Sequence, residues 1–213
     1  MTDDLSINAG EHWFVVGQTG AGKTYFETNF VLPRIRRQIV VDTEERDFPD
    51  DIWVPVAVSK AISLAKGNGA FRVRVPMGVE DEGRDDLDLL SRGLLRSGHD
   101  TLLYVDELAD FCRNGHVTGT TLGLIRKARK RGISVHAGTQ RPQDVHKGFY
   151  TQAQHHVWFY IEPADVYYWH LKAPYLDENM ASIPFKSFKW LHHAPSGSVT
   201  TYDPVPEFKG WKD

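Results

Sequence analysis

The sequence predicts an α/β fold with a mainly parallel central sheet and helices on both faces. Two observations indicate this class. Apolar runs typical of strands alternate along the chain with stretches typical of helices, and such alternation builds parallel sheets from βαβ units. In addition, the first apolar run leads directly into Gly17-Gln18-Thr19-Gly20-Ala21-Gly22-Lys23-Thr24, which fits the G-x-x-x-x-G-K-[ST] pattern in full and is followed by a helix-compatible stretch.

The expected strands, in chain order, span residues 13–16, 39–42, 52–58, 71–75, 101–105, 133–139 and 157–161. Pro55 restricts the third of them to a sheet edge, because proline cannot donate to a strand ladder. The expected helices span residues 25–32, 59–66, 87–95, 117–131, 143–152 and 163–171. Aromatic-rich runs at 185–192 and 198–202 predict a terminal β-hairpin. We therefore expect a core domain over residues 1–172 and a hairpin extension, packed on that core, over residues 173–213.

Composition narrows the class of protein. The 213 residues carry a net charge of −3, so any surface that binds nucleic acid must be a local basic patch. Cys112 is the only cysteine, which excludes an internal disulfide and favours a reducing compartment. No signal-peptide pattern is present, and no apolar run approaches the ~18 residues of a membrane span. We expect a protein that is not secreted and has no membrane span of its own.

The glycine-rich loop is expected to bind nucleotide phosphates. Its backbone N–H groups and the following helix N-terminus create a cavity that attracts anions. Lys23 would reach the β- and γ-phosphates, and the Thr24 hydroxyl would bind Mg²⁺. The alternative is an ordinary glycine-rich turn, which the flanking strand and helix disfavour.

An acidic pair ends the apolar strand 101–105. Asp106 stands where it can bind Mg²⁺ through water, and the adjacent Glu107 can orient and polarise an attacking water. Both acids could instead cap a helix that starts near Leu108. Gln140, at the end of the strand 133–139, could contact both the γ-phosphate and that water, or serve as an amide in a turn before Pro142.

The glycine loop, the Asp106-Glu107 pair and Thr139-Gln140-Arg141-Pro142, in this order and spacing, resemble the FtsK–HerA superfamily of P-loop ATPases, over about residues 12–162. The resemblance implies a RecA-like (ASCE) P-loop NTPase with strand order 5-1-4-3-2, and catalytic roles for Glu107 and Gln140. The short chain resembles the genome-packaging ATPases of tailless, membrane-containing double-stranded DNA viruses. One departure is that His155-His156 stands where many relatives carry an arginine before the fifth strand.

Five basic residues crowd the end of the expected helix 117–131, namely Arg126, Lys127, Arg129, Lys130 and Arg131. They spread around most of a helix circumference, so they cannot all face one ligand. A solvated helix end that complements the helix dipole would explain them. The resemblance instead implies that Arg129 acts on a neighbouring subunit's phosphates, with Arg131 as the second candidate. Lys127, Lys130 and Arg131 would contact DNA, as would Arg113 in the loop after the acidic pair.

The leading hypothesis is ATP-driven translocation of double-stranded DNA into a preformed capsid, with ATP and Mg²⁺ as ligands. The resemblance implies a homo-oligomeric ring, a hexamer or pentamer, that docks on a capsid vertex or portal protein, either in the host cytoplasm or at the virion packaging vertex. A nucleotide or small-molecule kinase would use the same loop without Glu107 or Gln140. A phage assembly or secretion ATPase typically carries a membrane span. The histidine pairs 155–156 and 192–193 have no zinc spacing, so no structural metal is expected.

Overall fold

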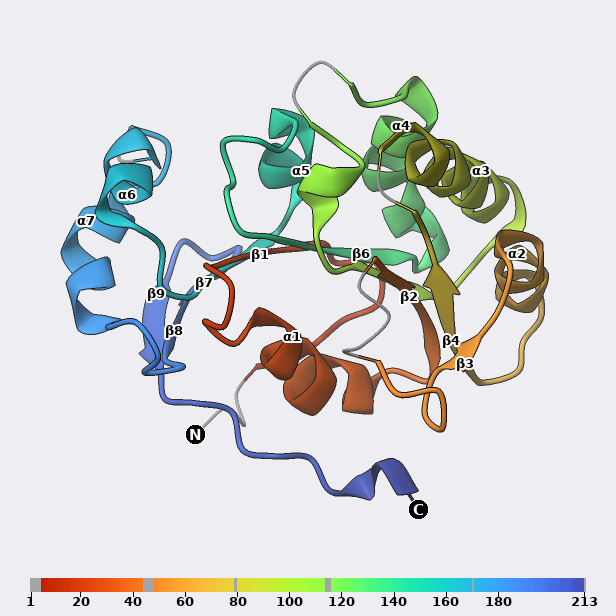
Figure 1. The fold of residues 1–213 in the computed structure, drawn as a ribbon, viewed down its shortest axis with the longest axis horizontal. Coiled ribbons are helices and arrows are strands. Elements are labelled where there is room, and N and C mark those ends of the chain that lie inside the picture. Colours follow the sequence, from red (N-terminus) through yellow and green to blue (C-terminus); the bar gives the residue numbers. More distant parts are fainter. Residues whose placement is uncertain (1–4, 44–47, 79, 114–115, 170, 213) are drawn as a thin grey trace.

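One continuous nine-stranded sheet organises the molecule (Figure 1). The computed structural model describes the chain except for residues 1–4, 44–47, 79, 114, 115, 170 and 213. Its strands are β1 (Trp13–Val16), β2 (Arg37–Asp42), β3 (Val54–Pro55), β4 (Phe71–Pro76), β5 (Leu102–Val105), β6 (Ser134–Thr139), β7 (His155–Trp158), β8 (Trp190–His193) and β9 (Val199–Tyr202).

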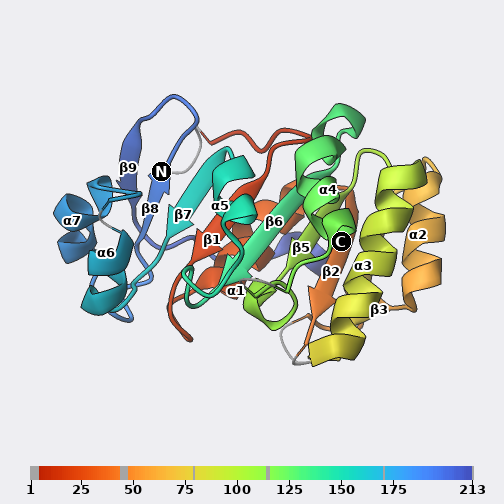
Figure 2. The same cartoon turned by 90° about the horizontal axis from the view of Figure 1, so that it is seen from above.

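The spatial order of the strands is β3-β4-β2-β5-β6-β1-β7-β8-β9. Figure 2 shows β2, β5, β6, β1 and β7 side by side in this order, with β8 and β9 at one edge. Strands β1 to β7 pair in parallel, and among the described strand pairs only β7–β8 and β8–β9 are antiparallel. The core strands β7-β1-β6-β5-β2 confirm the expected order 5-1-4-3-2. Two strands that the resemblance does not require, β4 and β3, extend the sheet beyond β2.

Helices cover both faces of the sheet, as predicted. They are α1 (Lys23–Phe26), α2 (Val58–Lys66), α3 (Glu80–Ser97), α4 (Gly119–Lys127), α5 (Lys147–Gln152), α6 (Pro163–Trp169) and α7 (Tyr175–Asn179). Helix α1 continues without a break as a π-helical turn (Glu27–Val31) and a 3-10 turn (Leu32–Arg34). Figure 1 shows α2 to α5 on one face, and α1 with the C-terminal segment on the other.

Several element boundaries differ from the sequence-based predictions. The helix predicted over 117–131 is α4 followed by a 3-10 turn at Ala128–Arg131, which ends at Gly132 in the left-handed conformation with φ 69°. The edge strand predicted over 52–58 shrinks to the two residues of β3. The fifth core strand begins two residues earlier than predicted, so His155 and His156 belong to β7 itself. Helix α7 has no counterpart in the prediction.

The central strands of the sheet are buried on both faces, and a separate hydrophobic core lies on each face. Phe14 and Val16 of β1 point into the core beneath α2 to α5, whereas Trp13 and Val15 point into the core around α1. Alternate residues of a strand face opposite sides of a sheet, so a continuous apolar run is the natural sequence for a strand covered by helices on both sides.

The predicted C-terminal hairpin is present as β8 and β9, and it continues the sheet beyond β7. Adjacent histidines point to opposite faces, as expected for strands. On one face the His155 and His192 rings are hydrogen-bonded, with Nδ1 and Nε2 2.8 Å apart, and on the other His156 stacks on His193. Burial lowers the pKa of His156 to about 4 and that of His192 to about 3. The division of the chain into two domains near residue 172 stays a prediction.

None of the helices within the described part of the chain combines the length and apolar character that a membrane crossing requires.

Candidate nucleotide site

The loops after three neighbouring strands converge at the carboxyl edge of the sheet. The glycine loop follows β1, Asp106 and Glu107 follow β5, and Gln140 follows β6. Together they line a cleft of about 270 Å³. The lining residues are Thr19, Gly20, Lys23, Thr24, Thr43, Asp106, Glu107, Asp110 and Gln140. The carboxyl ends of parallel strands next to a change in strand order are the usual ligand site of such sheets.

The glycine loop has the backbone geometry that its sequence predicts. Gly20 and Gly22 have φ angles of 75° and 110°, a region that side-chain-bearing residues rarely adopt. A Cβ at Gly17 would lie 2.6 Å from the Phe159 Cβ, so only glycine fits there. The loop is hydrogen-bonded to β6 and to the segment after β7, because the Gly17 N–H donates to the Thr139 carbonyl at 3.1 Å and the Gln18 N–H donates to the Tyr160 carbonyl at 2.9 Å.

Lys23 is folded back over this loop. Its ammonium donates to the Gly17 carbonyl at 2.7 Å, and the side chain is buried. The ammonium thus lies at the mouth of the backbone cradle, which is where the charge of a bound polyphosphate needs a counter-ion.

Thr24 and Asp106 meet although 82 positions separate them in the chain. The Thr24 hydroxyl donates to Asp106 Oδ1 at 3.1 Å, and the buried Tyr104 hydroxyl donates to the same oxygen. Burial, with the neighbouring Asp106 carboxylate, holds the pKa of Tyr104 well above its ordinary value, so this phenol stays protonated. A hydroxyl and a carboxylate side by side are hard oxygen ligands, and Mg²⁺ binds through one or two carboxylates plus substrate phosphates. The residues present therefore fit Mg²⁺.

Glu107 is held by the loop after β6. Its carboxylate accepts from the Thr139 hydroxyl at 2.9 Å and from the Gln140 N–H at 3.1 Å. Burial raises the pKa of the Glu107 carboxyl, while the Lys23 ammonium acts in the opposite direction. A carboxylate with a raised pKa, next to a phosphate cradle, is suited to accept a proton from water. The Gln140 side chain is exposed and lines the same cleft.

The predicted basic residues lie away from this cleft. Arg129, Lys130 and Arg131 form the 3-10 turn that precedes β6, at the amino edge of the sheet. The six residues of β6 separate them from the cleft by about 20 Å. Lys127 ends α4, whereas Arg113 lies near the carboxyl edge, where its backbone bridges to Val145. Arg129 thus does not contribute to the cleft of its own chain, and the predicted DNA contacts fall on different edges of the sheet.

Sequence reasoning missed Tyr104 and Thr139 as partners of the acidic pair. A signal for Tyr104 existed, because it precedes Asp106 by two positions and such residues share one side of a strand. The contact of Thr139 with Glu107 spans 32 positions and depends on β5 and β6 being neighbours.

Solved structures share this architecture at low sequence identity. The genome packaging NTPase B204 from Sulfolobus turreted icosahedral virus 2, in complex with ATP-γS, superposes with a TM-score of 0.76 and 19% identity, covering 94% of this chain and 100% of that chain. VirB4 of Thermoanaerobacter pseudethanolicus gives a TM-score of 0.60 and 10% identity over 93% of this chain and 90% of that chain. The chain has the fold of the FtsK–HerA P-loop ATPases.

A curated phage protein resembles part of the chain in sequence. Protein P9 of Pseudoalteromonas phage PM2 is 30% identical over 140 residues, which cover 64% of this chain and 62% of Protein P9. The match thus spans somewhat less than two thirds of the relative's length. No family model matches the chain.

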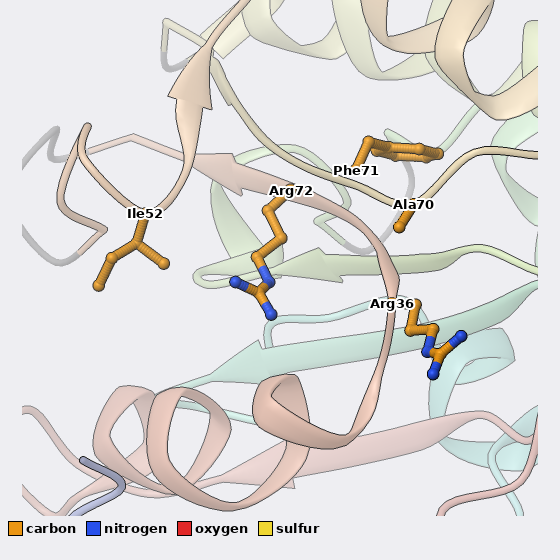
Figure 3. A pocket seen from close by; sticks show the side chains of 5 residues that line it. All are labelled: Arg36, Ile52, Ala70, Phe71 and Arg72. Carbon is orange, nitrogen blue, oxygen red and sulfur yellow. The ribbon is translucent and has the colours of Figure 1, made fainter. Parts of the chain in front are cut away.

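A second hollow lies at the opposite edge of the sheet and is larger, at about 530 Å³ (Figure 3). It is lined by Arg36, Ile52, Ala70, Phe71 and Arg72, which come from the amino end of β4 and the segments before β2, β3 and β4. The Arg72 guanidinium stacks over Trp211 at 4.8 Å. Among the described residues that line this hollow there is no carboxylate and no nucleophile, so it does not replace the nucleotide cleft as the catalytic candidate.

Proposed function

We propose that the chain is an ATPase that drives packaging of a double-stranded viral genome. The observation that carries the hydrolytic assignment is the position of Glu107, hydrogen-bonded by Thr139 and Gln140 beside the Thr24–Asp106 pair. The likeness to B204 and to Protein P9 supports the packaging role, since B204 is a genome packaging NTPase.

Each residue of the cleft has a distinct role in this proposal. Lys23 and the loop N–H groups bind the β- and γ-phosphates of ATP, and Thr24 and Asp106 would hold Mg²⁺, which would neutralise phosphate charge. Glu107 takes a proton from the attacking water, and the Gln140 amide orients that water against the γ-phosphate. A kinase needs no such carboxylate for water, so the placement of Glu107 favours hydrolysis over transfer to another acceptor.

Two variants separate binding from chemistry. Lys23→Ala is expected to weaken ATP binding, because it removes the cation at the phosphate cradle. Glu107→Gln is expected to retain ATP binding and to lose hydrolysis by about 10²-fold or more, since a general base contributes roughly 10²–10⁴. Calorimetric titration and phosphate release measure the two properties, with Glu178→Gln on the surface of α7 as control. Wild-type turnover in Glu107→Gln would refute the assignment.

The DNA partner is tested by stimulation of hydrolysis. A packaging motor grips phosphates and ignores bases, so stimulation by double-stranded DNA should be independent of sequence and fall steeply with salt. Arg113→Ala should reduce stimulation without changing basal hydrolysis. Lys127, Lys130 and Arg131 lie elsewhere on the subunit and are changed as a separate set. If double-stranded DNA does not stimulate hydrolysis by the wild-type oligomer, the proposal of DNA translocation is refuted, whereas the assignment as an ATPase stands.

We propose that Arg129 acts on the neighbouring subunit's nucleotide in a homo-oligomeric ring, because the length of β6 separates it from the cleft of its own chain. An arginine acting on the transferring phosphoryl group contributes roughly 10³–10⁵ in rate. Mixing the inactive variants Lys23→Ala and Arg129→Ala creates interfaces with an intact loop and an intact arginine, so activity should return. No recovery in rings shown to contain both variants would contradict this role.

The capsid vertex or portal protein is the proposed docking partner, at the packaging vertex or in the host cytoplasm.

A further inference from the structure

The arrangement of strands around the glycine loop determines the direction in which a bound nucleotide extends. Strand β1 lies between β6 and β7. Asp106 and Glu107 follow β5, and Glu107 accepts a hydrogen bond from Thr139 at the end of β6. The γ-phosphate end of the site therefore lies on the β6 side of β1. In a nucleoside triphosphate, the γ-phosphate and the base stand at opposite ends of the molecule. The sugar and base therefore extend to the opposite side, toward β7.

Two aromatic rings meet the glycine loop on the β7 side. A Cβ added at Gly22 would lie 3.1 Å from Phe188 Cδ1 and 3.5 Å from Phe159 Cε1. Phe159 is 2% exposed and packs against the buried side of the loop, whereas Phe188 is 45% exposed. Phe188 thus has one edge against the phosphate cradle and a large part of its ring open to solvent.

The backbone around Phe188 is strained. Phe188 and Lys186 have φ angles of 55° and 61°, in the left-handed region that bulky residues seldom enter. A turn closed by the Ser187 N–H, which donates to the Pro184 carbonyl at 3.0 Å, and by the Lys189 N–H, which donates to the Ser187 hydroxyl at 3.3 Å, maintains this conformation. An exposed apolar ring on strained backbone costs stability, and such strain clusters at ligand clamps and active sites.

We propose that Phe188 is the platform on which the base of the bound nucleotide stacks. The inference rests on the proposed function and adds a residue to that site. Stacking uses the π-face that every base has, and phenylalanine has no hydrogen-bonding group. The platform therefore accepts adenine and guanine alike, and phosphate contacts supply most of the remaining affinity.

The test compares nucleotides with inorganic tripolyphosphate, which has the phosphates and no base. Phe188→Ala should weaken binding of ATP and GTP by roughly 5- to 150-fold, the range of one base–aromatic stack, and leave tripolyphosphate affinity unchanged. Phe185→Ala is the matched control, because Phe185 lies in the same turn, is also 45% exposed and packs on Tyr160 at 5.2 Å. It should change none of the three affinities.

A second variant separates stacking from support of the fold. Phe188→Gly removes the ring and relieves the positive φ, so it should weaken ATP binding as much as Phe188→Ala while keeping or raising the melting temperature. Wild-type ATP affinity in both Phe188 variants would overturn the inference, as would an equal loss of tripolyphosphate binding. A wild-type protein that binds neither ATP nor tripolyphosphate would instead overturn the proposed function.

Discussion

Acid should destabilise the protein through His12, because the hydrogen bond that its Nδ1 accepts requires the neutral ring. His12 is 2% exposed, its Nε2 lies 2.9 Å from the Ile125 carbonyl, and its Nδ1 accepts from the Val135 N–H at 3.0 Å. Nε2 must then carry the ring proton. Protonation of Nδ1 would break the hydrogen bond that it accepts from the Val135 N–H. Burial lowers the pKa of His12 from 6.5 to about 4. The hydrogen bond to the Ile125 carbonyl acts in the opposite direction, whereas the neighbouring His136 and Arg129 lower this pKa further.

The sign and size of the effect follow from proton linkage. Because the folded pKa is the lower one, the unfolded chain binds more protons between about pH 6.5 and pH 4. The stabilisation is present above pH 6.5 and is lost as the pH falls. Between pH 7 and pH 5 the loss from His12 is about 2 kcal/mol. Since a domain has only about 5–15 kcal/mol in total, this loss is measurable.

Urea unfolding at pH 7 and pH 5 measures the free energy of unfolding of the wild type and of His12→Gln. Glutamine supplies a donor and an acceptor and does not titrate in this range. The variant starts less stable, but its loss between the two pH values should be smaller than that of the wild type by about 2 kcal/mol. His116→Gln, an exposed site, should keep the wild-type loss. An equal loss in His12→Gln and wild type would refute the reasoning.

Two further predictions concern the acidic pair. Gly138→Ala would place a Cβ 2.2 Å from the Asp106 carbonyl oxygen. We therefore expect a loss of about 1–3 kcal/mol in unfolding free energy together with loss of hydrolysis, measured by thermal melts and phosphate release. Gly119→Ala is the control and should preserve both properties, because its Cβ would meet nothing within 4 Å. Tyr104→Phe removes a hydrogen bond to a carboxylate oxygen of Asp106, and a hydrogen bond of this kind is worth about 1.5–3 kcal/mol. The variant should need a higher Mg²⁺ concentration for half-maximal hydrolysis. An unchanged Mg²⁺ requirement would count against the positioning role of this hydroxyl.

Much of the site was predictable because its signals are local in the chain. The conformation of residues 17–24 follows from glycines at fixed spacing between a strand and a helix, and the backbone preference of glycine acts without distant help. Asp106 and Glu107 stand together because they are covalent neighbours at a strand end. The core strand order was predicted from the family resemblance and is confirmed. The catalytic, metal-binding and DNA-binding roles stay predictions until the variants are measured.

Contacts between distant segments were decided only by the tertiary structure. The bonds from Thr139 and Gln140 to Glu107 exist because β6 lies beside β5, and Phe188 reaches Gly22 because the chain returns after β7 along the edge of the sheet. The crowded charges 126–131 illustrate the same limit, since only the direction of β6 shows that Arg129 lies at the edge away from the cleft. Short-range patterns reveal which residues can form a strand, loop or helix. The pairing of strands and the packing of side chains determine which of them meet, because those contacts depend on the order of elements in space, which no local stretch of sequence contains.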